Sequence, residues 1–307
     1  MNRIRLLLIP IFFLQVSAAG AKTVRVVTTT EDLAAITREI GGDRVSVDFI
    51  AKGVQDPHFI DAKPSYLLKL SRADLFVEIG LGLESGWAPL LLSGARNGRI
   101  QPGNIGYVRA ADGIALLEVP SGRIDRSGGD VHAEGNPHYW LDPANGKVIA
   151  LNIADGLMRI DPEGKAVYKQ NLERFAERLD AALSRWGAGM EPFKGERVVT
   201  YHNSWPYFLK RFGLQAVDYV EPKPGIPPAS THLKQLIERI QAEGVKIIIA
   251  EPYFDRKVPQ FLAEQSGATL VVLPPSVSTG GGIEDYFQLF DHLIDNLAKA
   301  FKESGVQ

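Results

Sequence analysis

The chain has 307 residues, of which 45% are hydrophobic and 23% are charged, so it has enough apolar side chains for two domains of ordinary size. Its formal net charge is −2, which argues against a nucleic-acid partner held by a basic surface. The chain contains no cysteine, so it forms no disulfide, and any metal site must use His, Asp or Glu.

The first residues have the three-part pattern of a secretory signal peptide. A short basic stretch at 2–5 is followed by an apolar run at 6–16 and then by small residues up to Ala21. The apolar run is too short to span the ~30 Å hydrocarbon core of a membrane. We therefore expect residues 1–21 to be cleaved and the mature protein to be periplasmic. We also expect it to be freely soluble, because it has no cysteine to carry a lipid.

Strand-like and helix-like segments alternate along the mature chain, which predicts βα units and mainly parallel sheets. In the first half we expect strands at 24–29, 45–50 and 74–79, with helices at 31–40 and 63–71. In the second half we expect strands at 197–201, 216–220, 246–250 and 270–273, with helices at 205–212, 230–243 and 286–301. The sequence therefore predicts an α/β protein with two lobes, at 22–161 and 190–307.

A long amphipathic helix is expected between the lobes, at 162–189. Its apolar residues recur at spacings of four and three from Tyr168 to Trp186, and charged residues fill the other face. Neither Gly nor Pro interrupts the pattern between Gly164 and Gly187. Such a helix would join the lobes as a rigid strut; the alternative is an ordinary surface helix of one lobe.

Three of the six histidines lie in loops where predicted strands end or helices begin. They are His58, His138 and His202. Ligands of open α/β sheets gather beyond the carboxyl ends of strands, and neutral imidazole is the commonest metal ligand. Three imidazoles plus a carboxylate or water suit tetrahedral Zn²⁺, whereas Mn²⁺ favours more oxygen ligands. Because widely separated histidines have no diagnostic spacing, the residues alone leave open that each is solvated or hydrogen-bonded.

The other three histidines have different contexts. His232 and His292 fall within predicted helices and are interpreted as structural, His232 near a helix start. His132 lies at 123–135, in a stretch without clear periodicity that we interpret as an exposed loop. We therefore expect His132 to be solvated, with a weak and mobile metal contact as the alternative.

Four segments give the sequence a resemblance to a known family, the zinc/manganese-type solute-binding proteins of bacterial ABC importers. They are Asp56-Pro57-His58, the more specific Asn136-Pro137-His138-Tyr139-Trp140-Leu141-Asp142-Pro143, His202 after its strand, and Ala250-Glu251-Pro252. The resemblance covers nearly the whole mature chain. It implies two lobes joined by a rigid helix, and one divalent metal held jointly by His58, His138 and His202.

Two departures from the family pattern concern the metal. Zinc-selective members often carry a loop rich in His and acidic residues. Here residues 123–135 contain a single histidine, His132. The family often supplies an Asp ligand after the last strand, whereas Leu273-Pro274-Pro275-Ser276 contains no carboxylate. Glu251 is the carboxylate that we expect as fourth ligand. The alternatives are that Glu251 hydrogen-bonds a ligand histidine and that water completes the site.

The expected function is that of a periplasmic binding protein rather than an enzyme. It would capture a divalent metal, zinc with manganese as the second choice, and deliver it to the membrane permease of an ABC importer. We expect a monomer. Two alternatives stay open: a secreted zinc metallohydrolase, for which a His-Glu-x-x-His segment and an evident general base are missing, and a periplasmic metallochaperone without a permease.

Overall fold

The computed structural model describes residues 23–122, 132–223 and 225–306. The expected signal peptide, residues 1–21, lies outside these ranges, as does most of the expected loop at 123–135. None of the helices within the described ranges combines the length and the apolar character needed to cross a bilayer.

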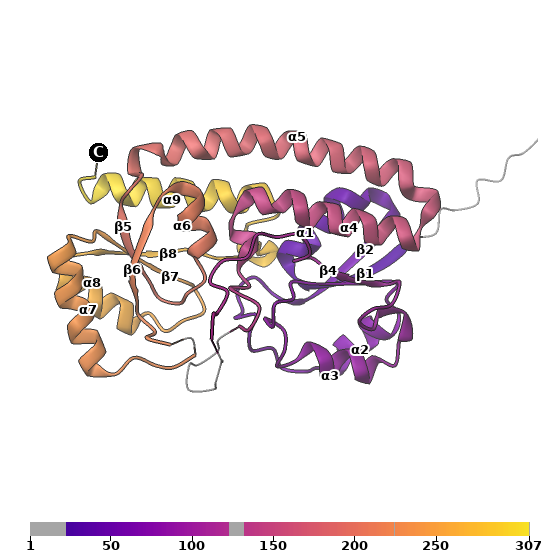
Figure 1. The fold of residues 1–307 in the computed structure, drawn as a ribbon, viewed down its shortest axis with the longest axis horizontal. Helices are drawn as coiled ribbons and strands as arrows, with labels where there is room; N and C mark the ends of the chain where they lie inside the picture. The colour runs from indigo at the N-terminus through magenta and orange to yellow at the C-terminus, as the bar shows by residue number, and fades with distance from the viewer. Residues whose placement is uncertain (1–22, 123–131, 224, 307) are drawn as a thin grey trace, which may run out of the picture.

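The N-terminal lobe is built on a parallel four-stranded sheet with the strand order β2-β1-β3-β4. Figure 1 shows α1 and α4 on one side of this sheet and α2 and α3 on the other. The elements are β1 (Val24–Thr30), α1 (Glu31–Gly41), β2 (Val45–Ala51), α2 (Pro64–Ser71), β3 (Leu75–Glu78), α3 (Ala88–Ala95), β4 (Tyr107–Arg109) and α4 (Gly146–Ile160).

The C-terminal lobe repeats this architecture with a parallel sheet of order β6-β5-β7-β8. Helices α7 and α8 pack on one side of the sheet, and α6 and α9 lie on the side of α5 (Figure 1). The elements are β5 (Arg197–Thr200), α6 (Pro206–Phe212), β6 (Gln215–Tyr219), α7 (Ser230–Glu243), β7 (Ile247–Ala250), α8 (Lys257–Ser266), β8 (Thr269–Val272) and α9 (Tyr286–Glu303). The predicted α/β class and the two parallel-sheet lobes are confirmed.

Helix α5 (Lys165–Met190) runs along both lobes, across the top of Figure 1, and packs against α1, α4 and α9. Its buried side chains, among them Phe175, Leu179 and Trp186, belong to one apolar core that contains Ile36 of α1 and Leu293 of α9. Each lobe also has a smaller separate core on the far side of its sheet. The helix therefore joins the lobes as predicted, through a core that both lobes share.

The ranges expected from the sequence leave out four of the helices and strands, α3, β4, α4 and α8. Strand β4 has only three residues and pairs with β3. Its extended conformation is therefore stabilised by a strand about thirty residues earlier in the chain. Helix α3 is apolar over most of its eight residues and has no polar face to reveal a helical period.

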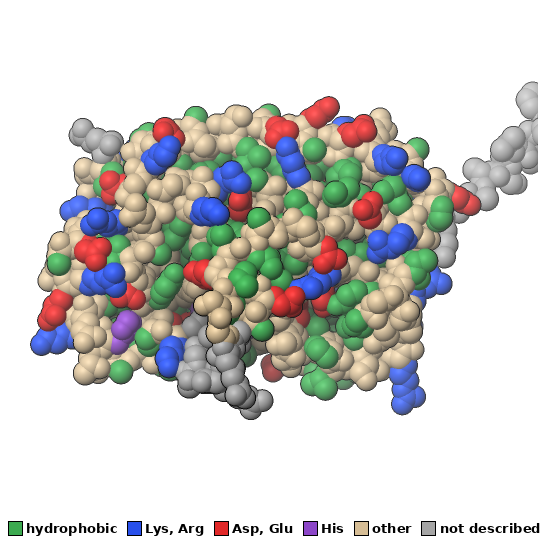
Figure 2. All heavy atoms as spheres, viewed as in Figure 1, with side chains coloured by type: hydrophobic (Ala, Val, Ile, Leu, Met, Phe, Trp, Pro, Cys, Tyr) green, Lys and Arg blue, Asp and Glu red, His purple; other side chains and the backbone are tan. Residues whose placement is uncertain are grey.

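On the face drawn in Figure 2, acidic and basic side chains are interspersed over both lobes.

Candidate metal centre

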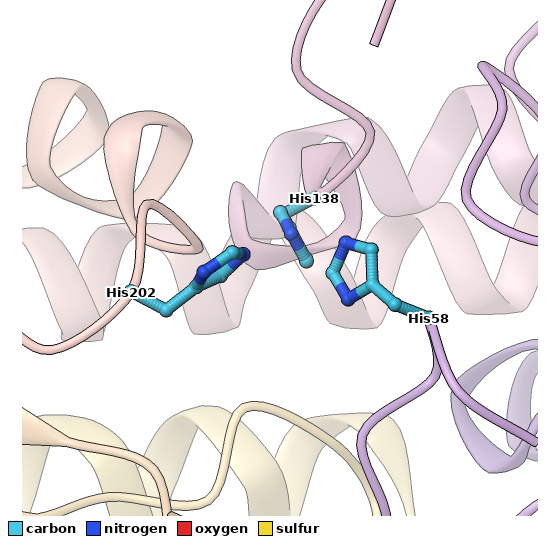
Figure 3. A group of neighbouring side chains, drawn as sticks. All are labelled: His58, His138 and His202. Atoms are coloured by element: carbon cyan, nitrogen blue, oxygen red, sulfur yellow. The ribbon is translucent and has the colours of Figure 1, made fainter. Parts of the chain in front are cut away.

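Three separate segments of the chain bring His58, His138 and His202 together at the boundary between the lobes. His58 follows β2, His138 precedes the turn at Tyr139–Leu141, and His202 follows β5. A ligand atom of each ring lies within 4.8 Å of those of the other two, and Figure 3 shows the rings pointing toward one another. All three residues are buried, with 7%, 2% and 6% of their surface exposed. The structure thus brings together the three histidines that the sequence singles out.

Two of the three rings are oriented by a carboxylate. Nδ1 of His58 lies 2.7 Å from Oδ1 of Asp56, and Nδ1 of His202 lies 2.9 Å from Oε2 of Glu221. Because an ionised carboxylate can only accept, each Nδ1 donates the proton, which leaves the lone pair of Nε2 available. Carboxylates that hold ligand histidines in this way fix the tautomer and raise the basicity of the ring.

Burial and neighbouring charge act differently on the three rings. Complete burial lowers the pKa of His138 well below its usual value, and positive charge on His58, His202 or His132 would lower it further. Burial also opposes charge on His202, but the hydrogen bond with Glu221 and the charge of Glu251 outweigh it and raise the pKa of His202. His138 is therefore held neutral, the form that coordinates a metal, whereas His202 binds a proton more readily.

The aromatic residues after His138 attach this segment to both lobes. The hydroxyl of Tyr139 donates to the carbonyl of Ile79 in the N-terminal lobe, at 2.9 Å. The indole N–H of Trp140 donates to the carbonyl of Pro275 in the C-terminal lobe, at 2.8 Å. His138 itself has no hydrogen-bond partner for either ring nitrogen among the described residues. The ring is thus positioned by its neighbours while both of its own polar atoms stay available.

Glu251, the carboxylate expected as fourth ligand, is buried beside the triad, with 1% of its surface exposed. Its Oε1 accepts a hydrogen bond from Nε1 of Trp205 at 3.0 Å. Burial raises the pKa of Glu251 to about 7, and the charge on His202 opposes that rise. Glu251 is not a member of the group whose ligand atoms all lie within 4.8 Å of one another. Direct ligation by Glu251 stays a prediction.

The remaining histidines occupy three different environments. His132 is half-buried, and its Nε2 lies 3.3 Å from Nε2 of His58, so the structure favours contact with the site over a solvated ring. His232 lies in the first turn of α7, and its Nε2 donates to the carbonyl of Tyr219 at 2.9 Å, which ties α7 to the end of β6. His292 is exposed on α9.

Sequence reasoning missed Asp56 and Glu221 as partners of the histidines. Asp56 is two residues before His58 and also accepts from its backbone N–H at 3.0 Å, so the contact is local. Glu221 follows β6 just as Glu251 follows β7, and each is followed by Pro. A Glu-Pro pair after a strand was the available indication, because side chains at that position lie at the carboxyl edge of the sheet.

Comparisons with known proteins agree with this geometry. Residues 26–300 match the family described as "ZnuA: Zinc-uptake complex component A periplasmic". The high-affinity zinc uptake system protein ZnuA of Brucella abortus is 33% identical over 166 residues, which cover 54% of this chain and 49% of that protein, about half its length. The manganese ABC transporter substrate-binding lipoprotein PsaA of Streptococcus pneumoniae is 25% identical over 295 residues, covering 94% and 92% of the two chains.

Solved structures share the fold over nearly the whole chain. A crystal structure of ZnuA superposes with a TM-score of 0.76 at 26% identity, covering 91% of this chain and 99% of the other. A ZnuA variant lacking residues 138–173 of its own chain, with zinc bound, also gives a TM-score of 0.76, at 27% identity, covering 91% and 98%. The resemblance inferred from the histidine segments is confirmed, and the chain belongs to the ZnuA family of periplasmic zinc-uptake components.

Proposed function

We propose that this protein is a periplasmic receptor that captures one divalent transition metal ion, zinc in preference to manganese, and passes it to the membrane permease of an ABC importer. The observation that carries the proposal is the convergence of three buried histidines from both lobes. Relatives named for zinc uptake and for manganese transport support the class of cargo. Family membership gives no support to the metallohydrolase alternative.

We propose His58, His138 and His202 as ligands of the ion. Their nitrogens match the donors that zinc accepts at about 2.0–2.1 Å, whereas manganese favours oxygen donors. Glu251 is proposed as the carboxylate of the site. It would either bond the ion directly or form a hydrogen bond to a ligand histidine. Asp56 and Glu221 would hold two of the rings and offset part of the charge of the ion.

Binding requires neutral imidazoles, so protons compete with the ion for the site. The ion is the cargo of the protein and undergoes no reaction there. We further propose cleavage of residues 1–21, lobes at 22–161 and 190–307 joined by the helix at 162–189, and a monomeric receptor.

Metal analysis tests the proposal directly. Protein purified from the periplasm should contain one divalent metal per chain, and calorimetric competition should favour zinc. Anomalous diffraction at the zinc edge should place the ion among His58, His138 and His202. Equal occupancy by manganese in direct competition would end the zinc preference, and a chain that binds neither metal would end the proposal. Genes for a permease and an ATPase beside this one would support delivery over simple metal storage.

A further inference from the structure

A short segment of the C-terminal lobe packs against the N-terminal lobe near the triad. It comprises residues 275–279, which follow β8, and we call it the post-β8 segment. All of its residues except Thr279 are buried, and Val277 belongs to the apolar core that both lobes share. The segment is therefore part of the packing between the lobes.

Two acidic residues of the N-terminal lobe hold the post-β8 segment. Oδ1 of Asp32 accepts from the backbone N–H of Val277 at 2.9 Å. Oε1 of Glu31 accepts from the hydroxyl of Thr279 at 3.0 Å. Both acidic residues are buried in the first turn of α1, where negative side chains commonly complement the helix dipole. Here their side chains also form hydrogen bonds from one lobe to the other.

The same contacts reach the loop that carries His58. Oε2 of Glu31 accepts at 2.7 Å from the backbone N–H of Gly53, which precedes His58 by five residues. Gly53 lies directly against the post-β8 segment, because a Cβ at this position would overlap the carbonyl oxygen of Val277. Glu31 thus binds both the loop of His58 and the post-β8 segment.

The post-β8 segment also contacts the residues that follow His138. The carbonyl of Pro275 accepts from the indole N–H of Trp140, whose ring centroid is 5.1 Å from that of His138. The segment itself belongs to the lobe that carries His202. It therefore connects the parts of the chain that bring the three histidines together, and Figure 3 shows these histidines arriving from separate segments.

Asp32 acts here as a hydrogen-bond acceptor, and its charge is unfavourable in this place. Burial raises the pKa of Asp32 to about 7, and the hydrogen bonds with Val277 and Ser276 oppose that rise only in part. The amide of Asn could accept the same hydrogen bond without the cost of a buried charge. Asn at this position should therefore preserve the contact, whereas Ala should remove it.

We propose that Glu31 and Asp32 are positioning residues of the metal site, which hold the post-β8 segment against the loop of His58 before the ion arrives. The inference rests on the proposed function and concerns residues that act through the segments carrying the ligands. The metal-free protein then keeps His58 and His202 near the distance at which they bind the ion. Without these contacts the ligands are assembled for only part of the time, and the affinity falls by that fraction.

Hydrogen exchange and zinc titration of Asp32→Ala test this on the protein purified from the periplasm. In the metal-free state the amide of Val277 should exchange about tenfold faster or more in the variant than in the wild type. Zinc affinity should fall by about tenfold, which is about 1.4 kcal/mol. X-ray absorption at the zinc edge should show the same ligands in both proteins, because the histidines still bind the ion. Asp32→Asn should restore both the slow exchange and the affinity.

Asp74→Ala is the matched control for a loss of stability alone. Asp74 is also buried, and it accepts from the backbone N–H of Arg25 at 3.1 Å, a contact within the N-terminal lobe. This variant should lower the free energy of unfolding and leave the zinc affinity of the folded protein unchanged. A comparison with Asp32→Ala therefore separates positioning of the ligands from general stability.

Two further variants disturb the same contacts from the other side. Thr279→Val removes only the hydroxyl that binds Glu31, so it keeps the inference testable if Asp32→Ala does not fold. Its zinc affinity should fall by a smaller factor than that of Asp32→Ala. Gly53→Ala should push the loop of His58 away from the post-β8 segment and weaken zinc binding. Gly98→Ala, where a Cβ would meet nothing within 4 Å, is its control.

The outcomes separate this inference from the function on which it rests. If Asp32→Ala keeps full zinc affinity, or if Asp74→Ala lowers the affinity as much, the inference is overturned and the receptor function stands. A change of ligands at the zinc edge in Asp32→Ala would mean that the carboxylate acts on the ion itself, which also overturns the inference. If the wild type binds neither zinc nor manganese, the proposed function fails and the inference falls with it.

Discussion

The two lobes meet in two regions of opposite chemistry. On the side of α5, apolar residues of both lobes form one continuous core. On the side of the triad, the lobes meet through buried polar rings, of which His138 has no hydrogen-bond partner among the described residues. The burial of apolar side chains favours folding and does not depend on precise orientation of the groups in contact. A buried polar group without a hydrogen-bond partner lowers the stability. The comparison indicates that the shared core fixes the lobes and so permits the site to keep polar atoms free for a ligand.

The largest expected effect comes from breaking the shared core. Trp186 is buried in α5, with its ring 5.2 Å from that of Phe290 of α9. Trp186→Ala should lower the free energy of unfolding by about 3–5 kcal/mol. Because α5 serves both lobes, urea unfolding followed by circular dichroism should show one transition for the whole chain. Leu236→Ala, in the separate core of the C-terminal lobe, is the matched control. Two resolved transitions in the wild type would contradict a shared core.

The next largest effect separates affinity from stability at the triad. His138→Leu should remove metal binding. The loss of metal affinity should exceed the factor of about 10–100 that is lost when a residue hydrogen-bonded to a metal ligand is replaced. The same variant without metal should be more stable by about 1–3 kcal/mol, since two buried unpaired nitrogens are replaced by an apolar side chain. His58→Ala and His202→Ala should also lose binding but gain no stability, because each leaves a carboxylate without its partner.

Calorimetry and thermal unfolding of these three variants, with His232→Ala and His292→Ala as controls, measure both quantities. Full zinc affinity in any one of the three would remove that residue from the site. A His138→Leu protein less stable than the wild type would indicate that the ring contributes to packing more than its polar atoms cost.

A smaller effect is expected at the carboxylates that hold two of the rings. Asp56→Asn and Glu221→Gln keep the side-chain shape but remove the charge, and each should weaken zinc binding by about 10–100-fold. Zinc titration in the presence of a competing chelator measures the loss. Unchanged affinity in Glu221→Gln would show that burial alone orients His202.

The smallest expected effect is a shift with pH. A raised pKa means that His202 keeps its proton to a higher pH than an ordinary histidine does. Zinc affinity should therefore be full above that raised pKa and fall as the pH drops through it. Glu221→Gln weakens the interaction that raises the pKa, so the midpoint of the affinity loss should move to lower pH. Zinc titrations between about pH 5 and 8, the range in which histidine changes charge, measure the midpoint. A midpoint that moves upward would contradict the assignment.

Much of the fold could be predicted because its information is local. The buried strand β7 (Ile247–Ala250) is an uninterrupted apolar run, and α5 repeats its apolar residues with helical spacing. Asp142 before Pro143 is typical of a helix N-cap followed by the first helical residue, and the Asp142 side chain accepts from the N–H of Ala144 at 2.9 Å. His58, His138 and His202 could be proposed together because strand ends, together with the family motifs, mark the edge where ligands gather.

The rest depends on contacts between residues far apart in the chain. Strand β4 is ordered by pairing with β3, and the ring of His202 is oriented by Glu221, which comes from the segment after a different strand. His132 meets His58 across 74 positions, and no local pattern in 123–135 indicates that contact. Composition and periodicity describe one segment at a time. They therefore predict helices and strands better than they predict the contacts between the loops at the ends of those elements.

The core beneath α5 also has a kinetic consequence. Lobes that share one core cannot part widely without exposing that core to water, which is unfavourable. A bound ion would then leave only when its bonds to nitrogen break inside a nearly closed site, and differences in affinity among such receptors lie mostly in the dissociation rate. We expect a long residence time for the ion.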